Sequence, residues 1–142
     1  PPPFPADAVE AFRTGTGPLA DDLRRLMRRH AAQLAENREI IEGVGRLARD
    51  SLALRQLHDR GMMGGHDDLV EVIAARAAGQ AGALGLAPRQ AQEIARPLAE
   101  IAILVARSAV DRWLDGAEPD LPAAADAAWD RVLAAARLLI AG

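Results

Sequence analysis

The sequence predicts an all-α fold, a helical bundle of about five to seven helices whose last two form a four-helix-bundle interface in a dimer. Three observations carry this prediction. Apolar residues recur every three or four positions along most of the chain, which is the spacing of an amphipathic helix. Runs of alternating polar and apolar residues, which would indicate strands, do not occur. Glycine and proline fall between the periodic segments, where helices begin and end.

The composition is that of one soluble globular domain. The 142 residues are 50% hydrophobic and 26% charged, carry a net charge of -3, and include no cysteine. A chain of this size can bury one core, and its acidic balance disfavours general binding to nucleic-acid phosphates. No apolar run reaches the roughly 18 residues needed to span a bilayer. We therefore expect a cytoplasmic protein without disulfides, cysteine-bound metals or membrane contacts.

The chain divides at the breaker "RTGTGP". Residues 1–17 are expected to be a linker or a short helix, and their start without methionine suggests that they continue a longer protein. Residues 18–142 are expected to form the domain, and its first helix spans 18–37 with proline and acidic residues in the first turn. The apolar stripe of this helix consists of Leu19, Leu23, Leu26, Met27, His30 and Leu34, and the arginines predicted to point away into solvent are Arg24, Arg25, Arg28 and Arg29.

Three further helices are expected between residues 38 and 80. The segment 38–51 carries isoleucine, valine and leucine at helical spacing despite two glycines. A helix over 52–61 is predicted to end in a loop formed by "GMMGGHDD", and a helix over 67–80 follows it. Acidic residues at the start of this last segment and glycine near its end agree with helix termini.

The longest pattern covers residues 88–116 and is apolar around nearly its whole circumference. Its polar residues form one narrow strip, and Pro97 predicts a kink. After the break "GAEPDLP", residues 123–140 form a final helix with a broad face of alanines. A surface helix of a monomer needs only one apolar face, so the two terminal helices predict a symmetric dimer. Trp113 and Trp129 are expected to brace this hairpin and its dimer seam.

His30 is the sharpest single feature, because it lies near the centre of the apolar stripe of the 18–37 helix. Two interpretations stay open. The residue is either a core histidine satisfied by a neighbour or a polar group that faces an internal ligand pocket. No Glu-x-x-His or His-x-x-x-His pair accompanies it, so a metal is not expected there.

Two methionines, Met62 and Met63, stand among glycines. Flexible methionines either line an adaptable apolar pocket or fill a gap in the core, and the sequence favours neither. The neighbouring His66, Asp67 and Asp68 resemble a metal site only loosely, because an acidic helix start explains them without a metal.

Two groups of arginines are further candidates for binding sites. The run "RRLMRRH" has no interleaved aromatic residues, so a solvated face is favoured over a nucleic-acid site. Arg112 projects into an apolar side of the 88–116 helix. We expect it to extend past Trp113, to pair with an acid such as Asp126, or to meet an anionic ligand.

Catalytic motifs are absent from the sequence. No Gly-x-Ser-x-Gly elbow, phosphate-binding glycine loop or zincin motif occurs. A helical chorismate mutase is disfavoured, because all 17 basic residues are arginine and a lysine is expected in that family's active site. We therefore expect no enzymatic activity and no cofactor.

The order of these patterns resembles the C-terminal domain of TetR-family transcriptional regulators. The resemblance covers about residues 18–140 and rests on "LRRLMRRHAAQLAENREIIEGVGRLARDS", "LVEVIAARAAGQ" and "ARSAVDRWLDG", followed by an acidic, proline-containing break and a final amphipathic helix. The helix-turn-helix of the family, which normally ends in a phrase like "YxHFxxK", does not occur in this chain.

The resemblance implies a homodimeric sensor domain whose central helices enclose a small, mostly hydrophobic effector. Effector binding would shift the separation of two DNA-reading heads and relieve repression, and DNA would be bound only through the missing N-terminal helix-turn-helix. The alternative is a ligand-free helical dimerisation or scaffold domain. An internal cavity on the order of a few hundred Å³ would distinguish the two.

The effector pocket implied by the resemblance would consist of aliphatic, methionine and histidine side chains, with His30 orienting a polar group of the ligand. Its lining residues would be Met27, His30, Leu34, Ile41, Val44, Met62, Met63, Ile73, Ile101, Leu104 and Val105. The expected dimer interface comprises Ile103, Ala106, Val110, Trp113, Ala125, Ala128, Trp129, Val132, Ala135, Ala136 and Leu139.

Overall fold

The computed structural model describes residues 4–141, and it describes the backbone but not the side chains of residues 58–64, 83 and 84. Over this part of the chain it contains helices and no strand, which confirms the all-α prediction. None of these helices is long and apolar enough to cross a membrane, where its residues are described. In chain order the helices are α1 (Ala6–Thr14), α2 (Leu19–Ala35), α3 (Arg38–Asp50), α4 (Leu52–Leu84), α5 (Pro88–Leu114) and α6 (Leu121–Ala141).

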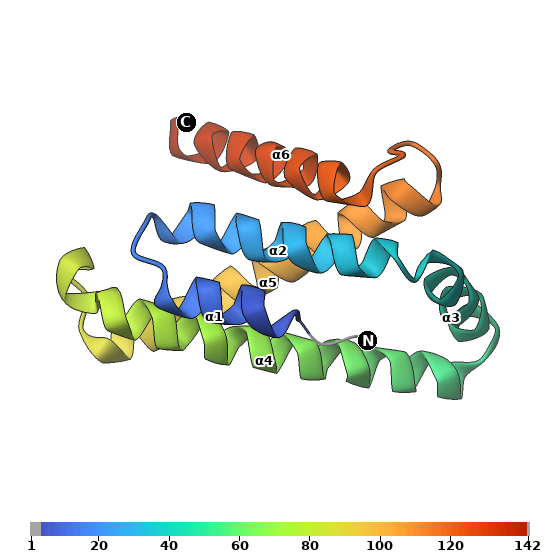
Figure 1. Cartoon of the computed structure of the whole chain (residues 1–142), viewed down its shortest axis with the longest axis horizontal. Helices are drawn as coiled ribbons and strands as arrows, with labels where there is room; N and C mark the ends of the chain where they lie inside the picture. The colour runs from blue at the N-terminus through green and yellow to red at the C-terminus, as the bar shows by residue number, and fades with distance from the viewer. Residues whose placement is uncertain (1–3, 142) are drawn as a thin grey trace.

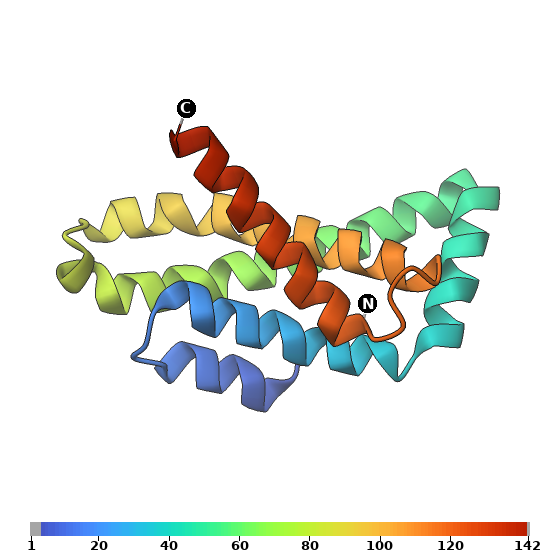
Figure 2. The same ribbon diagram turned by 90° about the horizontal axis from the view of Figure 1, so that it is seen from above.

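The helices α4 and α5 form a long antiparallel pair on which the others pack (Figure 1). The shorter helices α1 and α2 lie together against this pair, and α3 stands across one end, between α2 and α4. From above, α6 crosses the bundle obliquely, so that its C-terminal half projects beyond the other helices (Figure 2). The first half of α6 therefore packs on α2 and α5, while the second half leaves the body of the domain.

The predicted loop over residues 61–68 is wrong, because α4 runs unbroken through it. A glycine inside a helix costs about 1 kcal/mol relative to alanine, which weakens a helix without forbidding it. Burial of one leucine or isoleucine contributes about 2 kcal/mol, and Leu69 and Ile73 of α4 are both fully buried. Asp67 and Asp68 consequently lie within a helix, and an acidic helix start does not explain them.

Glycines end the two long helices where the backbone needs a positive φ. Gly85 follows α4 with a φ of +69°, and the N–H of Leu86 donates to the carbonyl of Ala81 at 2.9 Å. This is the hydrogen bond of a left-handed C-terminal cap, which favours glycine because a side chain would be strained there. Gly116 follows α5 with a φ of +80°, as the predicted break requires.

The final helix begins two residues earlier than the sequence predicts. Leu121 is its first residue, and the carboxylate of Asp120 accepts a hydrogen bond from the N–H of Ala123 at 3.3 Å. An aspartate in this position satisfies a backbone donor that the first turn leaves unpaired. Because of this early start, Leu121 is available to the core, where it is fully buried.

The core face of α5 consists mainly of alanines, joined by Val105 and Trp113. Ala95, Ala99 and Ala102 are completely buried, whereas Leu104 is 61% exposed. Small side chains allow the backbones of neighbouring helices to approach closely, and α4 and α6 pack along this alanine face. The apolar residues on the opposite side of α5 remain outside the domain.

Candidate functional site

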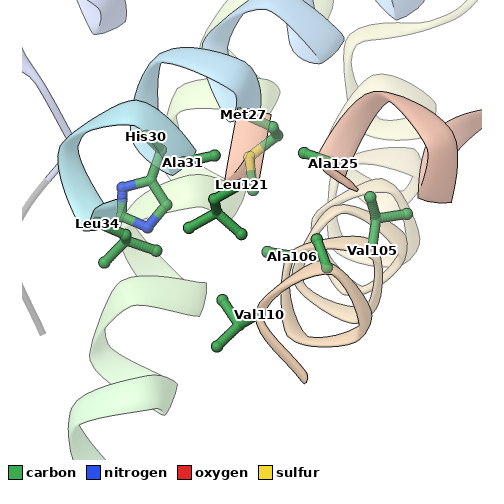
Figure 3. A pocket seen from close by; sticks show the side chains of 10 residues that line it. Met27, His30, Ala31, Leu34, Val105, Ala106, Val110, Leu121 and Ala125 are labelled. Carbon is green, nitrogen blue, oxygen red and sulfur yellow. The ribbon is translucent and has the colours of Figure 1, made fainter. Parts of the chain in front are cut away.

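The candidate ligand site lies where α2, α5 and α6 meet (Figure 3). Its cavity has a volume of about 10 Å³, which is room for about one water molecule. The side chains that surround it come from these three helices (Figure 3), and the small volume shows that they leave little space between them. The lining consists of Met27, His30, Ala31, Leu34, Val105, Ala106, Ala109, Val110, Leu121 and Ala125.

His30 is the polar residue at the edge of this cavity. Its ring packs on Phe4 with 4.3 Å between the ring centroids, and burial lowers the pKa of His30 from its ordinary value of 6.5 to about 4. The ring is therefore neutral at physiological pH. Its Nδ1 is buried and has no hydrogen-bond partner among the described residues.

The structure brings together four of the predicted pocket residues and disperses the others. Met27, His30, Leu34 and Val105 all line the cavity. Of the others, Ile73 lies in the main core of the domain, and Ile41 packs at the edge of a second buried cluster, which includes Trp113 and Leu121. Val44, Ile101 and Leu104 lie on the surface. The side chains of Met62 and Met63 lie outside the described residues.

Alanines complete the cavity, and the pocket prediction did not include them. Ala31 comes from the α2 stripe, Ala106 and Ala109 come from α5, and Ala125 comes from α6. A search for large apolar side chains overlooks such residues, because their contribution is to let helices come close. Their signal in the sequence is the spacing of Ala102, Ala106 and Ala109 along one side of a helix.

The four arginines of α2 pair with carboxylates on three helices and are not simply solvated. Arg24 binds Asp126 at 3.3 Å and Asp130 at 2.9 Å, and Arg28 binds Asp126 at 3.0 Å. The hydrogen bond to Asp130 raises the pKa of Arg24 above its usual value. These pairs fasten the first half of α6 to α2, and they neutralise charge that a nucleic-acid site would need.

The predicted pairing of Arg112 with Asp126 is not formed, because Arg24 and Arg28 bind that carboxylate. Arg112 itself lies on the surface. The cation above Trp113 is Arg38 from α3, whose guanidinium carbon lies 4.7 Å from the ring centroid. An arginine over an indole face is held by the negative face of the ring, so Trp113 helps to anchor α3.

Arg76 is a buried cation that the sequence analysis missed. Its side chain donates to the carbonyls of Phe12 at 2.6 Å and Gly17 at 2.8 Å and to the carboxylate of Asp22 at 2.7 Å. These bonds fix the end of α1 and the start of α2 against α4. A side chain at Gly15 would meet Asp22 at 2.5 Å, so the close approach of this carboxylate requires glycine.

The predicted dimer-interface residues divide into an internal and an external group. Trp113 and Trp129 are 4% and 7% exposed in the single chain, and Ala125 and Ala128 are buried with them. Leu139 is 84% exposed. Of the remaining residues, those that are partly buried are Ile103, Ala106, Val110, Val132 and Ala136, and Ala135 is exposed.

Exposed aliphatic side chains gather on the outer parts of α5 and α6. On α5 they are Ile94, Ile101 and Leu104, and at the end of α6 they are Leu138, Leu139 and Ile140. The last three are at least 76% exposed. A contiguous run of large aliphatics this open to water is typical of an interaction surface.

Known proteins offer no assignment. No protein-family model matches the chain, and neither a curated protein nor a solved structure is significantly similar to it. Within the described part of the chain, no three histidine, aspartate or glutamate side chains are placed to hold a metal ion.

Proposed function

We propose that this chain is a homodimerisation domain of the TetR C-terminal kind, in which α5 and α6 of two copies form a four-helix bundle. The observation that carries the proposal is the apolar stripe of α6. Its first half, represented by Leu121 and Ala128, is buried against α2 and α5. The same stripe continues through Ala135 and Leu139 after the helix has left the domain.

A second copy is the partner that fits both exposed surfaces. The end of α6 offers leucine and isoleucine, and the outer side of α5 offers Ile94, Ile101 and Leu104. In a two-fold dimer each copy supplies both surfaces, so two complementary apolar contacts form at once. Lipid is a weaker candidate, because charged residues such as Arg107 and Asp111 also lie on α5.

Sedimentation of the wild-type chain at tens of micromolar tests the dimer. We expect a dimer, and we expect Leu139→Asp to convert it to a monomer because each interface would then bury two carboxylates. Leu52→Asp is the matched control, since Leu52 is exposed at the other end of the molecule, on α4. A monomeric wild type would overturn the proposal, and so would equal loss of the dimer in both variants.

We also propose that a small hydrophobic effector binds in the cavity beside His30. The support is chemical, because the lining is apolar and the buried Nδ1 of His30 has no described partner. A small hydrophobic molecule with one hydrogen-bonding group matches this arrangement. With about 10 Å³ of space, such a molecule could enter only if α6, which carries Leu121 and Ala125, moved away.

The small volume also supports the ligand-free alternative, a dimerisation or scaffold domain with a solid core. A thermal-shift screen of hydrophobic small molecules separates the two proposals. If the site binds an effector, wild type is stabilised by a hit, and His30→Ala and Ala109→Leu both abolish the stabilisation, the first by removing the polar group and the second by filling the cavity. Unchanged binding in both variants would remove this cavity as the site.

DNA binding belongs to the proposal only through the N-terminal helix-turn-helix that the family carries. Each of the four described arginines of α2 lies beside a carboxylate, so this helix face has too little free positive charge for DNA, and the chain by itself is not proposed to bind DNA. Fusion of a helix-turn-helix ahead of residue 1 and a DNA-shift assay would test whether dimerisation through α5 and α6 spaces two such heads.

A further inference from the structure

A second hollow, the α1–α2 groove, lies between the first two helices and has a volume of about 80 Å³. It is larger than the cavity beside His30. Its floor is apolar, because Ala8, Ala11, Phe12 and Leu26 form it. Its rim carries Arg25 and Arg29, whose side chains are 73% and 50% exposed. The residues lining the groove are Ala8, Ala11, Phe12, Asp22, Arg25, Leu26 and Arg29.

The two rim arginines are placed to act on one ligand. Arg25 and Arg29 are four residues apart on α2, so they lie one above the other on the same face of the helix. Arg29 is paired with Asp7 at 2.7 Å, but both side chains are largely exposed. Exposed pairs of this kind are weak, so a competing anion can replace Asp7 at little cost.

The charge of Arg25 is not balanced within the groove. One oxygen of Asp22 accepts a hydrogen bond from Arg25 at 2.9 Å, and the other accepts one from Arg76 at 2.7 Å. Arg76 is buried and cannot turn to another partner, so it already neutralises this carboxylate. The guanidinium groups of Arg25, Arg29 and Arg76 therefore face only two carboxylates, those of Asp7 and Asp22. One positive charge is left in excess.

We propose that the α1–α2 groove binds a monocarboxylate with a short alkyl chain. The carboxylate accepts hydrogen bonds from Arg25 and Arg29, and the chain rests on Phe12 and Leu26. A single excess positive charge matches one carboxylate rather than a phosphate dianion. A volume of about 80 Å³ holds an alkyl chain of about three carbons, with the carboxylate at the rim.

Sodium butyrate at constant ionic strength is the probe, and amide chemical shifts in an NMR titration are the readout. We expect saturable shifts confined to α1 and the first half of α2, with a dissociation constant of about 1–10 mM for a ligand of this size. Shifts that increase linearly without saturation, or that spread over all helices, would overturn the proposal.

Variants and ligand analogues separate the carboxylate from the alkyl chain. Arg25→Gln and Arg29→Gln should each weaken butyrate binding at least about fivefold, while Arg46→Gln on α3 should leave it unchanged. Ala11→Leu fills the groove but keeps both guanidinium groups, and it should abolish binding. All four positions are open to solvent, so the variants are expected to fold.

Equal shifts with butyramide would show that the charge plays no part, and equal shifts with inorganic phosphate would show an adventitious ion only. Either result overturns the proposal. The outcome is independent of the dimer, because the groove belongs to α1 and α2, so a monomeric chain that binds butyrate is a distinguishable result.

Discussion

The two halves of α6 carry one apolar stripe and lie in opposite environments. In the first half, Leu121, Ala125 and Ala128 are at most 3% exposed against α2 and α5. In the second half, Leu139 and Ile140 are 84% and 85% exposed. The more hydrophobic half is the one that water reaches, so residue type alone does not decide burial along this helix.

The difference lies in what stands opposite each half. Alanines in the first half allow close packing against α5, and the ion pairs of Arg24 with Asp126 and Asp130 hold the helix to α2. The second half crosses over α5 and projects beyond the side of the bundle (Figure 2). The contrast predicts that substitutions in the first half alter the stability of one chain, whereas those in the second half alter association between chains.

The largest expected effect comes from Trp129→Ala in the packed half. Trp129 is 7% exposed in the main core, and removal of a buried tryptophan lowers the free energy of unfolding by about 3–5 kcal/mol. Leu139→Ala is the matched variant from the projecting half and should change this free energy by less than about 0.5 kcal/mol in a dilute, monomeric sample. Urea denaturation followed by circular dichroism measures both, and similar losses would remove the contrast.

Acid should act on the packed region through His30. Because burial lowers the pKa of His30 to about 4, the folded state favours the neutral ring, whereas the unfolded chain binds a proton near pH 6.5. The stability that this residue contributes is present above pH 6.5 and is lost as the pH falls toward 4, by about 3 kcal/mol in total.

Urea unfolding of wild type and His30→Gln across this pH range measures the loss. The variant keeps a polar side chain but has no titrating ring, so its stability should vary less between pH 6.5 and 4. If the free energy of unfolding changed equally with pH in the two proteins, His30 would not be buried in the folded state.

A smaller effect is expected from the ion pairs that fasten α6 to α2. Arg24→Met keeps the aliphatic stem but removes both pairs, and partial exposure limits the loss to about 1 kcal/mol. Arg107→Met, on the surface of α5, is the control and should be near neutral. The difference between the two should shrink in about 0.5 M salt, where exposed charges are screened. A salt-independent difference would indicate lost packing instead.

The sequence predicted most helices because their signals are local. The apolar stripe of α2 and the breakers around α5 and α6 depend on residues a few positions apart. The unbroken course of α4 could not be predicted in this way, because packing of Leu69 and Ile73 offsets the glycines that suggest a loop.

Three of the four correctly predicted residues of the candidate site come from one helix, and the fourth is Val105 of α5. Met27, His30 and Leu34 share a stripe of α2, so periodicity alone placed them together. The alanines from α5 and α6 were missed as pocket residues, since choosing them requires knowing which helices approach closely. Arg76 was also missed, although it lies three and seven residues after Ile73 and Leu69 and so falls on their buried stripe.

The sequence by itself determined where most of the helices form, which faces are apolar, and that cysteine chemistry is excluded, because these depend on composition and local spacing. The tertiary structure alone decided which apolar faces are covered, which carboxylate each arginine binds, and how little space remains beside His30. Those outcomes depend on contacts between residues far apart in the chain. For α6 the consequence is that one continuous stripe forms a core over its first half and an uncovered surface over its second.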